Sequence, residues 1–209
     1  MLQFITNTTS KVSIIDQVKA VLDGGCTWIQ IRMKNSSEAD VRNTIETIYP
    51  ICKEYKAFCI LNDYVNLAKE MNLDGVHVGK NDMLPSEARN ILGAEPMLGV
   101  TANSFLDIVK YANLDIDYFG VGPFQYTSTK EKLSPIIGFE GYKHIISEMN
   151  TNNIETPIVA VGGITISDID ELMQIGVNGV AVSGSIANSS NIEKTTKEFI
   201  NKLNKYRKF

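Results

Sequence analysis

Short apolar segments alternate with amphipathic segments from one end of this chain to the other. The apolar segments predict strands, and they cover residues 2–6, 28–32, 58–61, 75–78, 97–101, 118–121, 157–161 and 179–183. Between them, apolar side chains recur at helical spacing, as at Val41, Ile45 and Ile48. Strands that alternate with helices imply parallel strands joined by crossover helices.

Two architectures fit this alternation: a closed eight-stranded barrel and an open, doubly wound sheet. The number of candidate strands matches the barrel, and no GxGxxG motif follows the first of them. We therefore expect an α/β fold, a (β/α)₈ TIM barrel, in which residues 1–209 form a single domain, because no linker or break in composition divides the chain. Later helices are expected at residues 65–71, 85–92, 105–111, 142–149, 166–175 and 192–203, with starts at Pro85 and at Ser167-Asp168.

The overall charge and hydropathy argue against several classes of protein. The 209 residues carry a formal net charge of −4, whereas binding to nucleic acid or to a membrane surface favours net positive charge. No apolar run approaches the ~20 residues that span a bilayer, and the first residues lack the features of a signal peptide. We therefore expect a cytoplasmic protein with small-molecule substrates, no nucleic-acid partner and no membrane association. The sequence leaves the oligomeric state open, a homo-oligomer included.

Polar side chains gather where the expected strands end, which is the active face of a barrel. Gln30, Arg32 and Lys34 alternate along the end of the second strand, so they share one face if the segment is extended. Two cations and an amide suit an anion such as phosphate, since Arg can fork two oxygens and Lys acts as a point charge. An exposed edge strand with ordinary surface charges would show the same pattern.

The third and fourth expected strands are followed by carboxylates. Asn62 and Asp63 close the third strand, and Asp82 follows the fourth, so both carboxylates would face the same barrel mouth. Two carboxylates without a Cys/His cluster suit a hard cation such as Mg²⁺, which prefers one or two carboxylates together with substrate phosphates. The alternative is that each Asp caps a helix, and Asp63 is well placed to cap the helix expected at residues 65–71.

The last three expected strands are followed by a second polar group. Thr127-Ser128-Thr129-Lys130 comes after the sixth strand and predicts either a phosphate clamp or a plain surface loop. Gly162-Gly163 follows the seventh strand, and Ser183-Gly184-Ser185 ends the eighth. Barrels often bind phosphate through backbone N–H groups after strands seven and eight, so this pairing favours a phosphate site.

Other chemistry is poorly represented. His77 lies inside a candidate strand and is more readily a hydrogen-bonded core histidine than a general base, and His144 fits a helix surface. The three cysteines form no CxxC pair and are expected to be reduced thiols. The sequence contains no nucleophile elbow and no Walker-type phosphate loop.

Taken together and in order, these motifs resemble those of the thiamine-phosphate synthases, a family of phosphate-binding TIM barrels. The matching motifs are Gln30-x-Arg32-x-Lys34, Asn62-Asp63, Asp74-Gly75-Val76-His77-x-Gly79-x-x-Asp82, Gly120-x-Gly122-Pro123, Thr127-x-Thr129-Lys130 and Gly162-Gly163-Ile164. They cover almost the whole chain, and their joint occurrence is specific although no single motif is.

The resemblance implies a transferase of thiamine biosynthesis that joins hydroxymethylpyrimidine pyrophosphate to thiazole phosphate and releases pyrophosphate, with Mg²⁺ as cofactor. It implies that the pyrophosphate is held by Gln30, Arg32, Lys34 and Asn62, and that Mg²⁺ is bound by Asp63 and Asp82. The expected catalytic residues are Lys130, Arg32 and Lys34, of which Lys130 would reach the leaving pyrophosphate.

The resemblance also implies a pocket for the thiazole phosphate, formed by Thr127, Thr129, Gly163, Ser183 and Gly184. Thr101 stands where the family commonly has Ser and keeps the hydroxyl group, so it is expected among the substrate-binding residues.

Two other functions compete with this one. A related thiazole tautomerase shares the barrel, but it has His after the glycine of the sixth strand, where this chain has Pro123. A non-catalytic barrel that only binds a phosphorylated ligand need not keep both Asp63 and Asp82 together with three cations.

Overall fold

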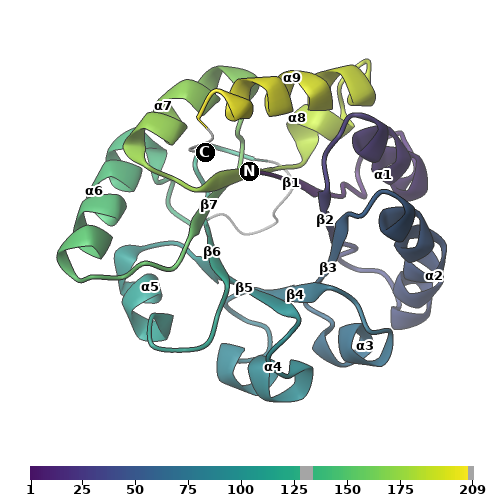
Figure 1. The fold of residues 1–209 in the computed structure, drawn as a ribbon, viewed down its shortest axis with the longest axis horizontal. Coiled ribbons are helices and arrows are strands. Elements are labelled where there is room, and N and C mark those ends of the chain that lie inside the picture. The colour runs from purple at the N-terminus through teal and green to yellow at the C-terminus, as the bar shows by residue number, and fades with distance from the viewer. Residues whose placement is uncertain (128–133, 207–209) are drawn as a thin grey trace.

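The computed structural model, which describes residues 1–127 and 134–206, is a closed barrel of eight parallel strands in sequence order. Helices surround the barrel, as Figure 1 shows in a view along its axis. The strands are β1 (Leu2–Ile5), β2 (Trp28–Ile31), β3 (Phe58–Asn62), β4 (Gly75–Val78), β5 (Met97–Ala102), β6 (Tyr118–Val121), β7 (Ile158–Val161) and β8 (Gly179–Val182). The predicted TIM barrel is therefore confirmed, and each end of each strand lies within one residue of its predicted position.

The helices follow the strands in alternation. They are α1 (Ile14–Asp23), α2 (Glu38–Glu54), α3 (Val65–Glu70), α4 (Pro85–Leu92), α5 (Phe105–Tyr111), α6 (Gly138–Thr151), α7 (Ile169–Ile175), α8 (Gly184–Ala187) and α9 (Ile192–Asn204), with a 3₁₀ turn η1 (Ile166–Asp168). Pro85 opens α4 as predicted. The start expected at Ser167-Asp168 is confirmed for α7, whose N-cap residue is Asp168. The turn η1 precedes it and is closed by a capping box between Thr165 and Asp168. Within the described residues no helix has the length and hydropathy that crossing a bilayer requires.

Two apolar layers hold the barrel together. The larger lies between the helices and the outer surface of the strands, and it includes fully buried Phe4, Ile29 and Phe119. The smaller fills the barrel interior and consists of Trp28, Ile60, Tyr118, Val159 and Ala181. The barrel is therefore a packed core whose open side is its rim of loops.

Two similar tripeptides, Asp74-Gly75-Val76 and Asn178-Gly179-Val180, mark the starts of β4 and β8. The side chain of Asp74 accepts a hydrogen bond from the Cys59 backbone N–H at 2.9 Å, and that of Asn178 accepts one from Ile158 at 2.8 Å. A Cβ on the following Gly75 would lie 2.2 Å from the Met97 backbone oxygen, so no side chain fits there. The pattern thus satisfies backbone donors of the preceding strand and allows the next strand to approach closely.

Candidate active site at the C-terminal end of the barrel

The C-terminal ends of the strands enclose a cavity of about 320 Å³. Its walls come from the segments that follow β1, β2, β6, β7 and β8. Five of the predicted site residues line it: Arg32, Thr127, Gly163, Ser183 and Gly184. The structure therefore brings together residues that are up to 152 positions apart in the sequence, at the end of the barrel where the fold predicts a site.

One wall of this cavity is backbone. Gly162 and Gly163 have φ of +103° and +70°, which an L side chain rarely adopts. A Cβ on Gly163 would lie 2.6 Å from the backbone oxygen of Tyr126, and one on Gly162 would lie 2.8 Å from Cα of Pro123. Only glycine therefore permits the β7 loop to pack against the β6 loop and leave a wall without side chains.

The β8 loop completes the same wall. Ser183 precedes α8, which Gly184 opens, and the Ser183 side chain makes no capping hydrogen bond. Ser185 Oγ donates to the backbone oxygen of Ile164 at 2.7 Å, which ties the start of α8 to the β7 loop. Backbone N–H groups at such a turn bind anions, and α8, which the sequence did not predict, orients the turn.

Polar residues after β1 also line the cavity, and the sequence analysis missed them. They are Thr6, Asn7, Thr8 and Thr9. Thr6 Oγ1 donates to the Arg32 backbone oxygen at 3.1 Å and accepts from the Arg32 N–H at 2.8 Å. The loop after β1 therefore holds the backbone of Arg32 in place. The signal was present, since a polar run directly after a barrel strand belongs to the active face.

Lys34, Asp63 and Asp82 form a second cluster beside the cavity. Lys34 Nζ lies 2.8 Å from Asp63 Oδ2, and the carboxyl groups of Asp63 and Asp82 are close enough to shift each other's pKa. Burial, helped by Asp82, raises the pKa of Asp63 to about 6 although Lys34 acts in the opposite direction. Burial would also raise the pKa of Asp82, but the interaction with Asp63 and the charge of Lys34 outweigh it and hold that pKa below its ordinary value.

Neither carboxylate caps a helix, so that alternative is wrong. The N-cap residues of α3 and α4 are Tyr64 and Leu84, and neither helix start has a side-chain capping bond. Asp82 Oδ2 instead accepts the Gly79 backbone N–H at 2.9 Å. Asp63 has φ of +72°, a costly conformation for an L residue, and its own N–H donates to the His77 backbone oxygen.

Three further residues singled out in the sequence, Gln30, Asn62 and His77, lie within barrel strands below the loops. Gln30 and Asn62 are buried, with 2% and 7% of their surface exposed. His77 is buried too, and its ring nitrogens lie 3.1 Å from Tyr118 Oη and 2.9 Å from Thr101 Oγ1. The expectation of a hydrogen-bonded core histidine is therefore confirmed, and the exposed His144 lies on α6 as expected. Thr129 and Lys130 fall outside the described residues.

Fold and site together define a class: a (β/α)₈ barrel whose C-terminal mouth combines a backbone-lined cavity, cations and a carboxylate pair. A family model described as thiamine monophosphate synthase matches residues 2–186. The chain therefore belongs to the thiamine monophosphate synthase family.

Individual relatives agree with this assignment. The chain is 44% identical over 200 residues to thiamine-phosphate synthase of Bacteroides thetaiotaomicron, with 96% of each chain covered. It is 47% identical over 188 residues to that of Flavobacterium johnsoniae, covering 90% of this chain and 89% of the relative. The solved structure of thiamine phosphate pyrophosphorylase from Pyrococcus furiosus matches it with a TM-score of 0.87 at 27% identity, covering 99% of this chain and 96% of the other.

Proposed function

We propose that this chain joins hydroxymethylpyrimidine pyrophosphate to thiazole phosphate, releasing pyrophosphate and forming thiamine phosphate, with residues 1–209 as one catalytic domain. The proposal depends on one observation: two groups of residues suited to bind phosphate lie at the C-terminal end of the barrel. Cations and the carboxylate pair lie on the β2–β4 side, and the backbone-lined cavity lies on the β7–β8 side. Both substrates carry phosphate groups, which cross a bilayer only at high cost, so we place the reaction in the cytoplasm.

Arg32 and Lys34 would act on the pyrophosphate. Charge on the leaving group grows as the carbon–oxygen bond breaks, so cations placed there stabilise the transition state more than the bound substrate. Lys34 is paired with Asp63 in the structure, and a cation bound to that carboxylate would weaken the ion pair and leave the ammonium for the substrate. Gln30 and Asn62 would add amide donors from the barrel interior.

Asp63 and Asp82 are the residues that would hold Mg²⁺. Burial and the neighbouring Asp82 raise the pKa of Asp63, so a cation that compensates the negative charge of the pair would be favoured there. Their hard oxygen atoms suit Mg²⁺, which needs only one or two protein carboxylates when substrate phosphates complete its shell. Bound there, Mg²⁺ would neutralise charge on the pyrophosphate.

The second substrate would bind in the cavity of about 320 Å³. Thr127, Gly163, Ser183 and Gly184 line it and would hold the thiazole phosphate through hydroxyl and backbone N–H groups. Thr101, at the end of β5, would contact the pyrimidine substrate. The roles of Thr129 and Lys130, including contact of Lys130 with the leaving group, rest on the family resemblance alone.

Separate binding of the pyrophosphate and of the thiazole phosphate fits the chemistry of the reaction. The carbon that bears the pyrophosphate can lose it to give a resonance-stabilised pyrimidine cation, which the thiazole nitrogen captures. Such a reaction requires neutralisation of the leaving group and alignment of two substrates. It requires no enzyme nucleophile.

The test is incubation of the purified protein with both substrates and Mg²⁺, followed by measurement of thiamine phosphate and pyrophosphate. We expect both products in equal amounts, and none in excess chelator. Isomerisation of a thiazole carboxylate phosphate in place of coupling would support a tautomerase, against which Pro123 in the cavity wall already argues. Binding of both phosphorylated substrates without turnover would support the non-catalytic barrel that only binds phosphorylated ligands.

A further inference from the structure

A continuous set of hydrogen bonds crosses the barrel interior beneath the proposed site. Gln30 Nε2 donates to Gln3 Oε1 at 3.3 Å, and Gln3 Nε2 donates to Tyr118 Oη at 3.0 Å. The same phenol oxygen lies 3.1 Å from His77 Nδ1, and His77 Nε2 lies 2.9 Å from Thr101 Oγ1. The chain of contacts therefore runs from β2 through β1, β6 and β4 to β5, and it ends at a predicted substrate-binding hydroxyl.

Two glycines provide the space for these rings. A Cβ on Gly99 of β5 would lie 2.2 Å from Tyr118 Cζ, and a Cβ on Gly120 of β6 would lie 2.7 Å from His77 Cε1. In each case the strand that faces a ring has no side chain where the ring lies. The phenol and the imidazole are therefore fixed by packing as well as by hydrogen bonds.

Counting donors gives this set of hydrogen bonds a direction. Gln3 Nε2 donates to the phenol oxygen of Tyr118, and burial raises the pKa of Tyr118 well above its ordinary value, so it remains a phenol. Its single proton is then available only to His77 Nδ1. A neutral imidazole that accepts at Nδ1 carries its proton on Nε2, which donates to Thr101. The hydroxyl proton of Thr101 is therefore directed away from His77, and Thr101 is partly exposed near the C-terminal end of β5.

We propose that Tyr118 and His77 are positioning residues that fix the Thr101 hydroxyl as a hydrogen-bond donor to an acceptor atom of the pyrimidine substrate. This inference rests on the proposed function.

The direction can be measured without turnover. The chain has two histidines, so ¹⁵N NMR of the imidazole nitrogens gives a simple spectrum in which exposed His144 is an internal reference. At about pH 8, above the ordinary pKa of imidazole, we expect His77 to carry its proton on Nε2 with Nδ1 bare. A proton on Nδ1, or a mixture of tautomers like that of His144, would overturn the proposal. Because this measurement needs no substrate, its failure is distinct from a failure of the synthase assay.

Tyr118→Phe tests the effect on the reaction. It removes the hydroxyl but keeps the ring, whose centroid lies 4.9 Å from that of Trp28. We expect His77 to lose its single tautomer and kcat to fall about tenfold, as for the loss of one hydrogen bond, while KM for thiazole phosphate is unchanged. Tyr142→Phe is the matched control, since it also removes a buried hydroxyl, bonded to the Val121 backbone oxygen, outside this set of contacts. Equal losses of kcat in the two variants would show a purely structural role and overturn the proposal.

Discussion

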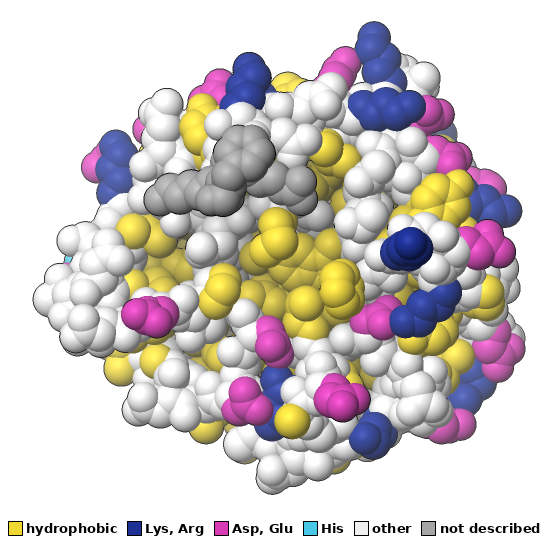
Figure 2. All heavy atoms as spheres, viewed as in Figure 1, with side chains coloured by type: hydrophobic (Ala, Val, Ile, Leu, Met, Phe, Trp, Pro, Cys, Tyr) yellow, Lys and Arg dark blue, Asp and Glu magenta, His cyan; other side chains and the backbone are white. Residues whose placement is uncertain are grey.

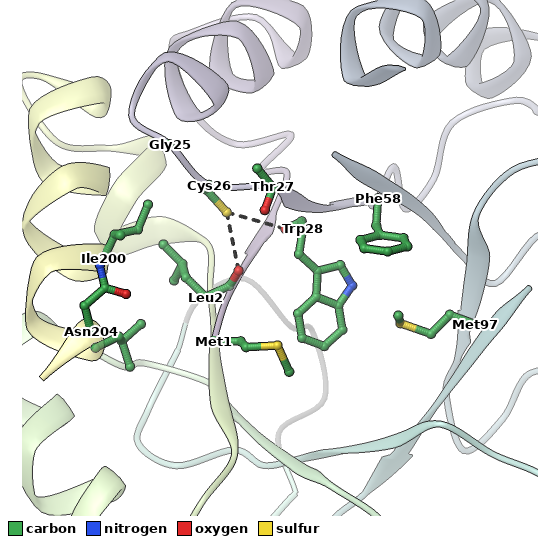
Figure 3. Close-up of a pocket in the computed structure, with 11 residues that line it drawn as sticks. Met1, Leu2, Gly25, Cys26, Thr27, Trp28, Phe58, Met97, Ile200 and Asn204 are labelled. Atoms are coloured by element: carbon green, nitrogen blue, oxygen red, sulfur yellow. Dashed lines mark hydrogen bonds between the residues drawn. The ribbon is translucent and has the colours of Figure 1, made fainter. Parts of the chain in front are cut away.

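The two ends of the barrel differ in the polarity of the side chains that they present. The N-terminal end, which faces the viewer in Figure 2, has apolar side chains at its centre and charged ones mainly around its rim. A cavity of about 200 Å³ lies there, and among its lining residues are Met1, Cys26, Trp28, Phe58 and Met97 (Figure 3). Its lining includes no Asp, Glu, Lys or Arg side chain among the described residues.

The C-terminal end instead brings charged and polar groups together, and the carboxyl group of Asp63 lies close to that of Asp82. Positive φ and unpaired polar atoms occur at both ends, since Lys56 and Asn72 share the positive φ of Asp63, and Trp28 Nε1, like Asn7 Nδ2, is buried without a hydrogen-bond partner among the described residues. The two ends therefore differ in their charged groups: the apolar end and the helix layer stabilise the fold and hold the charged groups of the polar end in place.

Trp28→Ala should have the largest effect on stability. The Trp28 side chain is 8% exposed and packs across the barrel floor against Tyr118, so its removal leaves a large cavity. We expect a loss of about 3–5 kcal/mol in the free energy of unfolding, measured by urea denaturation, with kcat of the folded fraction reduced less than tenfold. A large fall in kcat with little loss of stability would contradict the conclusion that the N-terminal end serves stability and the C-terminal end serves chemistry.

Asp82→Ala should show the reverse behaviour. Loss of one carboxylate from the pair should lower kcat on the order of 10²–10³-fold, as for other lost electrostatic groups, because Mg²⁺ would be held poorly. Loss of Asp82 leaves the Gly79 backbone N–H without its acceptor, but it also removes one of two neighbouring carboxylates, so these opposing effects should keep the change in unfolding free energy below ~1 kcal/mol.

The matched control for Asp82→Ala is Asp117→Ala at the opposite end. Asp117 Oδ2 accepts the Leu98 backbone N–H at 2.7 Å and pairs with Arg89 at 2.8 Å. Its loss leaves a partly buried donor unpaired, so we expect about 1–2 kcal/mol of destabilisation and unchanged kcat. Melting curves measured beside rates would show whether stability and turnover separate as the two ends do.

The strands of the barrel could be predicted from the sequence, but the side-chain contacts inside it could not, for a physical reason. Strand positions follow from apolar segments and from glycines at strand starts, which are local features. The contact of Tyr118 with His77 depends on barrel closure and strand register, which join residues 41 positions apart. Asp63 was open to a helix-cap interpretation because spacing does not reveal its positive φ. The Asn7 loop was overlooked although its position after β1 was informative.

The smallest predicted effect concerns the carboxylate pair itself, in protein without Mg²⁺. The pKa of Asp63 is raised to about 6 in the folded protein, above the ordinary value of about 4 in the unfolded chain. Between these values the folded state binds more protons than the unfolded state, so stability should fall as pH rises from about 4 to about 6. Asp63→Asn removes this dependence, and above pH ~6 it should be more stable than the parent by on the order of 1 kcal/mol, the opposing shift of Asp82 being allowed for. Urea denaturation across this pH range, with Asp117→Asn measured in parallel, would check the sign. A parent protein that gained stability over the same range would show that the polar end is not under the electrostatic strain inferred from its geometry.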